Sequence, residues 1–293
     1  MYDFEAIYEA RSTAHAIALR VEHPEAKILA GGSDLLIETR AGKFAGASVI
    51  SIYKIDELRG VTMDPDGAIR IGPLTSFSGI VRDPIIRQHF KVLGDAAETV
   101  GSPQLRNIGT IGGNVCNGVT SADTASTLMA WDAVMEYEGP SGKRTVPIRE
   151  HYIKPGVVSL APDEILTSIL IPRESYDGCF GHYIKYAMRA AMDIATLGCS
   201  VNARLSKDCK TVERMRAAYG VAGPVPMRAP SAEAAALEQP VSEDTVTAAA
   251  KAALADVNPR NSWRASRDLR MQLVFELTRR AFRESIIQAG GAL

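Results

Sequence analysis

The hydrophobic positions of the first fifty residues follow two different periods. After Ser12, a residue type that caps helices, apolar side chains recur at helical spacing up to residue 21. The apolar run from residue 27 to 30 predicts a short buried strand, residues 35–40 predict a helix, and residues 48–52 predict a second strand. The opening segment therefore predicts a small β-α-β unit.

Short strand and helix patterns alternate in the middle of the chain, beginning with a strand at residues 69–71. Residues 133–138 alternate between apolar and acidic side chains, which predicts a strand with one solvated face. A turn signal at residues 139–142 leads into a returning strand at 144–148, so we expect a hairpin. Residues 172–178 are the best candidate for a domain boundary.

The last third of the chain changes from strands to helices. Residues 181–186, 194–205 and 212–221 have strand-like content and precede a proline-rich stretch at 224–230. Two helices are then predicted, one over residues 242–255 and a final one capped by Ser266. No internal repeat interrupts this order, which indicates an α+β fold.

Composition narrows the classes of function. The chain has 33 lysines and arginines against 34 aspartates and glutamates, a balance that supplies no positive field for nucleic acid or an acidic membrane. Neither a signal-peptide pattern nor an apolar stretch of about eighteen residues is visible, so we expect a cytoplasmic protein without a membrane span. The four cysteines and five histidines are scattered, and none of them is expected to bind a metal or an iron–sulfur cluster.

The first candidate site is the glycine pair in AGGSD at residues 30–34. It lies between a predicted strand and a predicted helix, where glycine permits a positive φ and successive N–H groups can bind a phosphate. The third glycine of the Rossmann G-x-G-x-x-G pattern is missing. A plain tight turn is the alternative interpretation.

The second candidate site is the glycine-rich segment at residues 109–114, followed by short polar side chains up to Asp123. Such a loop offers many backbone and side-chain donors to a polyoxygenated ligand. The alternative is structural, with Ser121 as a helix N-cap and Asp123 as an acidic residue in the first turn.

Together, AGGSDL at residues 30–35 and TIGGN at 110–114 resemble the flavin domain of molybdenum hydroxylases, which has the vanillyl-alcohol-oxidase type of FAD fold. Residues 183–189 and 192–195 resemble the start of the same family's C-terminal domain. Within the family, residues 116–123 and 259–266 look most like the bacterial xanthine dehydrogenases.

The resemblance implies a domain organisation. It predicts an FAD-binding domain over residues 1–174, divided into lobes at about 1–54 and 55–174. An α+β domain of the carbon monoxide dehydrogenase flavoprotein type is expected to follow over residues 175–293.

The resemblance also implies which residues bind FAD. The first loop should wrap the pyrophosphate, and its predicted contacts are Lys27, Ile28, Leu29, Ala30, Gly31, Gly32, Ser33 and Asp34. The second loop should contact the diphosphate and ribityl chain through Thr110, Gly113 and Asn114. Valine at Gly31 or Gly113 is predicted to prevent flavin binding in a chain that still folds.

Further contacts are implied near the flavin ring. Asp123 should hold a polar group of the cofactor, and Leu166 should pack on adenine or flavin. Lys185 should approach the isoalloxazine edge and favour an anionic reduced flavin, although a solvated strand lysine is the alternative. Val100, beside Gly101, stands where animal relatives have an aromatic residue, which changes the expected stacking and nicotinamide pocket.

For function, the resemblance implies the FAD subunit of xanthine dehydrogenase. The substrate would be hydroxylated at a molybdenum cofactor on a large subunit, and electrons would pass through two [2Fe–2S] clusters on a small subunit to this FAD and then to NAD. The subunits would assemble as one heterotrimer or a pair. Alternatives are the same role with carbon monoxide, nicotinate or another aza-heterocycle as substrate, a free-standing FAD oxidoreductase, and a non-enzymatic interaction protein.

Overall fold

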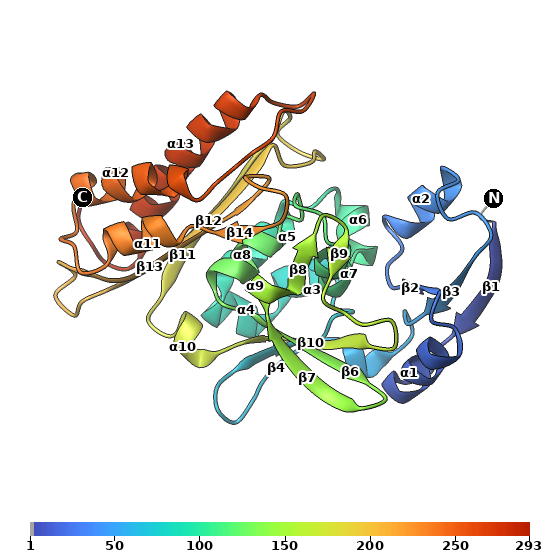
Figure 1. Ribbon diagram of the computed structural model, residues 1–293. Helices are drawn as coiled ribbons and strands as arrows, with labels where there is room; N and C mark the ends of the chain where they lie inside the picture. The colour runs from blue at the N-terminus through green and yellow to red at the C-terminus, as the bar shows by residue number, and fades with distance from the viewer. Residues whose placement is uncertain (1–2) are drawn as a thin grey trace.

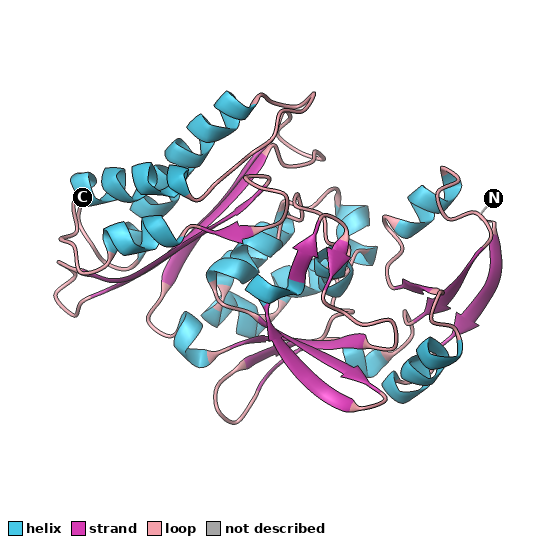
Figure 2. Cartoon of the chain, in the orientation of Figure 1, coloured by secondary structure: helices cyan, strands magenta, loops and turns pink. Residues whose placement is uncertain are grey.

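Three hydrophobic clusters, each associated with its own sheet, organise the computed structural model, which describes residues 3–293 (Figure 1). The sheets have the strand orders β1-β3-β2, β4-β5-β10-β6-β7 and β11-β12-β13-β14, and a two-stranded β8-β9 pair is added. Helices and sheets are both abundant and mostly segregated along the chain, so the predicted α+β class is confirmed (Figure 2).

The first sheet contains the predicted β-α-β unit. Its strands are parallel, with β3 pairing to both β1 and β2. The predicted burial of β2 is wrong: Lys27 is exposed, and Ile28 and Leu29 are half-buried, because β2 is an edge strand. Strand β1 was not predicted. The elements are β1 Phe4–Glu9, α1 Thr13–Glu22, β2 Lys27–Leu29, α2 Leu35–Arg40 and β3 Ala47–Ser51.

The second sheet is antiparallel and carries the largest core, which packs between its strands and a layer of short helices (Figure 2). The predicted hairpin is confirmed as β6 and β7. The elements are η1 Asp56–Leu58, β4 Val61–Met63, β5 Ile69–Ile71, α3 Phe77–Arg82, α4 Pro84–His89, α5 Lys91–Glu98, α6 Pro103–Ile108, α7 Ile111–Cys116, α8 Ala125–Ala130, β6 Val134–Gly139, β7 Gly142–Pro147, α9 Ile148–His151, β8 Tyr152–Lys154, β9 Val157–Val158, β10 Ile165–Ile171 and α10 Arg173–Tyr176.

The third sheet is antiparallel and packs against the C-terminal helices. The predicted cap at Ser266 is confirmed, since its hydroxyl accepts a bond from the Leu269 N–H of the final helix. Ser242, predicted as the first residue of a helix, is instead the N-cap of that helix. The elements are β11 Phe180–Tyr186, β12 Leu197–Leu205, β13 Val212–Gly220, β14 Met227–Arg228, α11 Pro230–Ala236, α12 Glu243–Ala252, η2 Ala253–Ala255 and α13 Arg267–Gln288.

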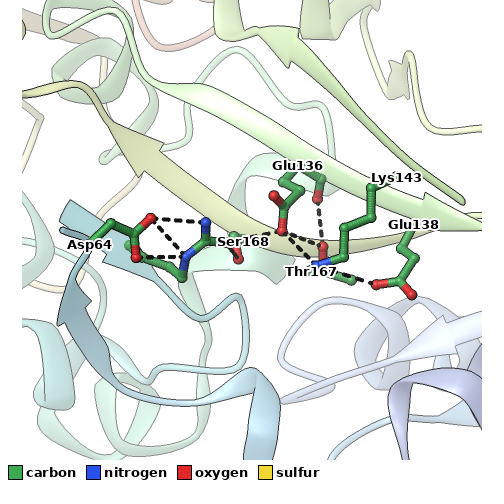
Figure 3. Close-up of polar contacts among 7 residues, drawn as sticks. Asp64, Glu136, Glu138, Lys143, Thr167 and Ser168 are labelled. Atoms are coloured by element: carbon green, nitrogen blue, oxygen red, sulfur yellow. Dashed lines mark hydrogen bonds and ion pairs between the residues drawn. The ribbon is translucent and has the colours of Figure 1, made fainter. Parts of the chain in front are cut away.

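A charged network crosses one face of the second sheet (Figure 3). Arg70 on β5 donates to Asp64 at 2.9 Å, to Glu136 on β6 at 3.0 Å and to Ser168 on β10 at 2.8 Å. Burial by itself would raise the pKa of Glu136, but Arg70 and Lys143 hold this pKa below its usual value. The face predicted to be solvated is therefore covered at Glu136, which is only 9% exposed, whereas Glu138 on the same face is half-buried.

A buried histidine holds α7 in place through a hydrogen bond to its backbone. The Nε2 atom of His151 lies 3.1 Å from the carbonyl oxygen of Val115 in α7, and a carbonyl can only accept, so Nε2 carries a proton. In the neutral ring Nδ1 is then an acceptor, and it lies within hydrogen-bonding reach of the Tyr137 hydroxyl. His151 has no exposed surface, and burial lowers its pKa to about 4.

Replacing Arg70 with methionine should destabilise the fold because it leaves the half-buried Asp64 carboxylate and the buried Glu136 carboxylate with fewer partners. We expect a loss of about 1–3 kcal/mol in the free energy of unfolding by urea titration. Lys91→Met, which breaks the exposed pair with Asp95, is the control and should cost less than about 1 kcal/mol. Equal losses in the two variants would contradict this assignment.

His151 should make the fold acid-sensitive. Its pKa falls from 6.5 in the unfolded chain to about 4 in the folded one, so the unfolded chain binds more protons between these values. Stability is thus fully present above pH 6.5 and falls by about 3 kcal/mol as the pH approaches 4. His151→Gln keeps a donor and an acceptor without a charge and should lose this contribution. Parallel pH curves for the two proteins would rule the histidine out.

Candidate functional site

The two glycine loops, about eighty residues apart in sequence, lie against each other. An added Cβ at Gly31 would overlap the carbonyl oxygen of Ile108 and lie 3.2 Å from the Cα of Gly109. Gly32 has a φ of +73°, in the left-handed region that favours glycine. Asn117 also links the loops, since its amide donates to the Asp34 carboxylate at 2.6 Å. Close backbone approach therefore requires the first glycine of the pair.

The first loop presents free donors beside a small cavity. Within residues 3–293, the backbone N–H groups of residues 31–33 donate to no protein acceptor. The cavity next to them has a volume of about 230 Å³ and is lined by Leu29, Ala30, Gly31, Leu36, Ser51, Tyr53 and Ile108. Unpaired N–H groups that follow a strand and precede a helix can bind a phosphate group.

The second loop begins α7 and has its donors partly engaged. The Thr110 hydroxyl accepts from the Gly113 N–H at 3.1 Å, which leaves its own O–H as a donor. The side-chain oxygen of Asn114 accepts from Thr124 at 2.6 Å, and its NH₂ group remains a donor. Thr110 and Asn114 thus keep side-chain donors that no protein group within residues 3–293 engages, whereas the Gly113 N–H is already bonded within the protein.

A buried ion pair continues from the second loop to β11. Lys185 Nζ lies 2.8 Å from Asp123 Oδ2 and donates to the Thr99 carbonyl at 3.0 Å. The two charged side chains are only 10% and 9% exposed. Burial raises the pKa of Asp123, and Lys185 and the Tyr183 hydroxyl oppose that rise. The alternative of a solvated lysine is therefore wrong.

The structural alternative for Asp123 is also wrong. Helix α8 begins at Ala125, its N-cap is Thr124 rather than Ser121, and the Asp123 carboxylate is turned toward Lys185. A turn sits beside this pair: Val100 is 8% exposed, and Gly101 has a φ of +47°.

Most of the predicted residues fall along one line of contacts. It runs from the first loop through the Ile108 backbone to Thr110 and Asn114, crosses to Thr124, and ends at Asp123 and Lys185. Leu166 is not part of it, since this residue is 5% exposed in the main core. Sequence reasoning assigned no role to Asn117, Thr99, Thr124 or Tyr183; of these, only Asn117 and Tyr183 lie within quoted motifs.

Residues 3–293 contain no group of three or more histidine, cysteine, aspartate or glutamate side chains arranged to hold a metal ion. No helix in the same range is both long and apolar enough to cross a membrane.

Comparison with known proteins identifies the family. Residues 2–174 match the FAD binding domain in molybdopterin dehydrogenase, and residues 182–285 match the CO dehydrogenase flavoprotein C-terminal domain. The chain is 41% identical over 293 residues, the full length of both proteins, to a xanthine dehydrogenase FAD-binding subunit of Escherichia coli O157:H7. It is 30% identical over 272 residues to the carbon monoxide dehydrogenase medium chain of Hydrogenophaga pseudoflava, covering 92% of this chain and 93% of that one.

A solved structure agrees with these matches. The carbon monoxide dehydrogenase of Hydrogenophaga pseudoflava aligns with a TM-score of 0.90 at 31% identity over 96% of each chain. The predicted two-part fold, an FAD-binding domain followed by a flavoprotein C-terminal domain, is confirmed. The chain therefore belongs to the FAD-binding flavoprotein subunits of the molybdenum hydroxylases, the family that includes xanthine dehydrogenases.

Proposed function

We propose that this chain is the FAD-carrying electron-transfer subunit of a xanthine dehydrogenase. It would take electrons from [2Fe–2S] clusters on a small subunit and pass them as hydride to NAD, while a large subunit hydroxylates xanthine at a molybdenum cofactor. The observation that carries the proposal is the line of polar groups from the free N–H groups at residues 31–33 to Lys185. The assembly is proposed to be cytoplasmic, as one heterotrimer or a pair.

The residues present fit an extended FAD. Unpaired N–H groups at Gly31, Gly32 and Ser33 suit a pyrophosphate, and the close contact between Gly31 and Ile108 brings the second loop to the same place. Thr110 and Asn114 then offer the next donors toward the ribityl chain. Lys27, Ile28, Leu29, Ala30 and Asp34 are proposed as further contacts of the first loop, with Gly113 in the second loop and Val100 and Gly101 near the rings. Leu166 is left out because its side chain is buried in the main core.

The ring end of the site is proposed at Lys185 and Asp123. Bound FAD supplies the redox chemistry. The protein contributes a cation whose direction is fixed, because Asp123 and the Thr99 carbonyl both hold the Lys185 ammonium group. An ammonium group already held at the edge of the flavin ring stabilises the negative charge of the reduced ring without having to move when that charge forms.

The choice of xanthine rests on the relative that is 41% identical over the full length and on residues 116–123 and 259–266. The alternative is another substrate, such as carbon monoxide or nicotinate, since relatives named for these also match. Native purification followed by assays with xanthine and NAD tests the proposal. FAD in the chain, large and small partner subunits, and NAD reduction by xanthine are expected. A colourless chain without partners would contradict the flavin role, and turnover only with another substrate would support the alternative.

Gly113→Val should weaken FAD binding in a folded chain. Gly113 is exposed, and apart from its chain neighbours and the backbone of α7, an added Cβ would meet within 4 Å the Thr110 hydroxyl oxygen, at 3.0 Å. The valine would crowd the proposed donor, and losing one such bond corresponds to a rise in Kd of about tenfold or more, measured by fluorescence titration. Gly94→Ala, a glycine in α5 with room for a Cβ, is the control.

Stoichiometric FAD with unchanged affinity in Gly113→Val would remove the second loop from the site. A Gly31→Val variant cannot serve as the same test, although the sequence predicted that it would fold without binding flavin. A side chain there would overlap the Ile108 backbone, so loss of flavin could not be separated from loss of the contact between the lobes.

Lys185→Met should lower the midpoint potential of bound FAD because it removes a fixed cation that favours the anionic reduced ring. The expected size is about 30 mV for every 1.4 kcal/mol of lost stabilisation. The double variant Lys185→Met/Asp123→Asn controls for the carboxylate that the single change would leave buried and unpaired. Potentials equal to that of the wild type in both variants would place Lys185 away from the ring.

A further inference from the structure

The carboxylate of Asp123 is held by two side chains that come from one strand. Lys185 Nζ lies 2.8 Å from Oδ2 of Asp123, and the Tyr183 hydroxyl donates to Oδ1 at 3.2 Å. Both residues belong to β11, where side chains two positions apart point to the same face of the sheet. Each oxygen of the carboxylate therefore has its own partner, and these two partners fix the orientation of the group.

The Tyr183 hydroxyl is a lasting donor in this contact. An ionised carboxylate can only accept hydrogen bonds, so the shared proton belongs to the tyrosine. Tyr183 is only 7% exposed, and burial together with the charge of Asp123 raises the pKa of Tyr183 well above its usual value. The hydroxyl thus stays protonated and neutral, and it stabilises Asp123 without adding a charge of its own.

The Lys185 ammonium group keeps one donor for a ligand. An ammonium group has three N–H bonds, and here one is directed to Asp123 and one to the Thr99 carbonyl at 3.0 Å. Within residues 3–293 it has no third protein acceptor. One N–H is therefore left for the edge of the flavin ring, and Asp123 decides how much of the positive charge is offset there.

The net charge of this pair depends on whether Asp123 is ionised. An ionised Asp123 offsets Lys185, whereas a protonated one leaves a single positive charge in a region that is about nine-tenths buried. Burial raises the pKa of Asp123, and Lys185 and Tyr183 act in the opposite direction. In the part of the chain that the structure describes, no other titratable group faces this carboxylate. The Tyr183 hydroxyl therefore favours the neutral pair.

The hydroxyl can be removed without removing the side chain that carries it. The ring of Tyr183 belongs to the main hydrophobic cluster, and phenylalanine would keep that packing. The Asp123 side chain is only 9% exposed, so solvent has little access to replace the lost donor. A buried acceptor that loses a donor is destabilised, and the effect is larger when the acceptor is charged. The ionised form of Asp123 would bear that cost.

We propose that Tyr183 is a positioning residue of the flavin site. Its hydroxyl holds the Asp123 carboxylate aligned and ionised, and the carboxylate in turn sets the direction and the net charge that Lys185 presents to the ring. Tyr183 acts through Asp123 rather than on the flavin. This inference rests on the proposed function, in which Lys185 lies at the ring edge.

The test is the pH dependence of the flavin midpoint potential in Tyr183→Phe, measured by spectroelectrochemical titration of the full-length, FAD-loaded chain. Without the hydroxyl, Asp123 takes up its proton at a higher pH and leaves Lys185 unopposed, which stabilises the anionic reduced ring. The inflection that Asp123 causes in the potential should therefore move to higher pH by about one to two pH units. In that window the potential of the variant should exceed that of the wild type, and at higher pH the two should coincide.

Tyr219→Phe is the matched control. Tyr219 lies on β13 of the same sheet, is fully buried, and has its hydroxyl bonded to the hydroxyl of Thr278. It packs in the C-terminal hydrophobic cluster rather than against Asp123. This variant loses the same atom from a buried tyrosine, so it should keep the wild-type dependence of potential on pH.

A second readout separates the possible failures. Carboxyl carbon-13 NMR of the oxidised, FAD-loaded chain, assigned with Asp123→Asn, should show Asp123 titrating at higher pH in Tyr183→Phe than in the wild type. An unchanged Asp123 titration would overturn the positioning role, and so would an unchanged potential curve or an equal displacement in Tyr219→Phe. A wild-type chain that binds no FAD would instead refute the proposed function.

Discussion

The approach of Gly31 to the backbone of Ile108 and Gly109 is the constraint on which the rest of the site depends. Any side chain at Gly31 would overlap the Ile108 carbonyl oxygen, so only glycine lets the two lobes close to this distance. The contact places the free N–H groups of residues 31–33 beside the start of the second loop. Two segments that are weak phosphate motifs when considered singly thus lie against each other, and both keep free donors, the N–H groups of residues 31–33 in the first and the Thr110 and Asn114 side chains in the second.

A second constraint holds the far end of that row. Lys185 comes from β11 in the third sheet, whereas Asp123 and Thr99 belong to the helical layer over the second sheet. A buried ion pair is costly to desolvate and contributes little net stability, so its value here lies in fixing a position. The Lys185 ammonium group is bonded to both Asp123 and the Thr99 carbonyl. The third sheet and the helical layer therefore hold this charged pair between them with little contact to solvent.

Specific hydrogen bonds also hold the second loop against the main core. His151 bonds to the carbonyl of Val115 in α7, and the neutral ring lies against the Tyr137 hydroxyl of β6. The second loop is therefore anchored to the main core, which the second sheet builds. The Arg70 network keeps the strands of that sheet together on one face. In the C-terminal part of the chain, Arg270 of α13 joins two segments in the same way, since it donates to the Thr196 carbonyl before β12 and to the Ser262 hydroxyl before α13.

The sequence by itself determined several of the elements and the family. Periodicity and capping residues predicted α1, α12 and α13 and the β6–β7 hairpin, because these patterns are local. Motif resemblance led to the flavoprotein family that the comparisons show. Burial and partners were decided only by the tertiary structure. A solvated strand position was the alternative for Lys185, and Glu136 was predicted on a solvated face, yet each is covered by residues distant in sequence. Strand β2 is half-exposed because it lies at a sheet edge. Local patterns carry no information on which distant segments meet, and those meetings set the electrostatics of the site.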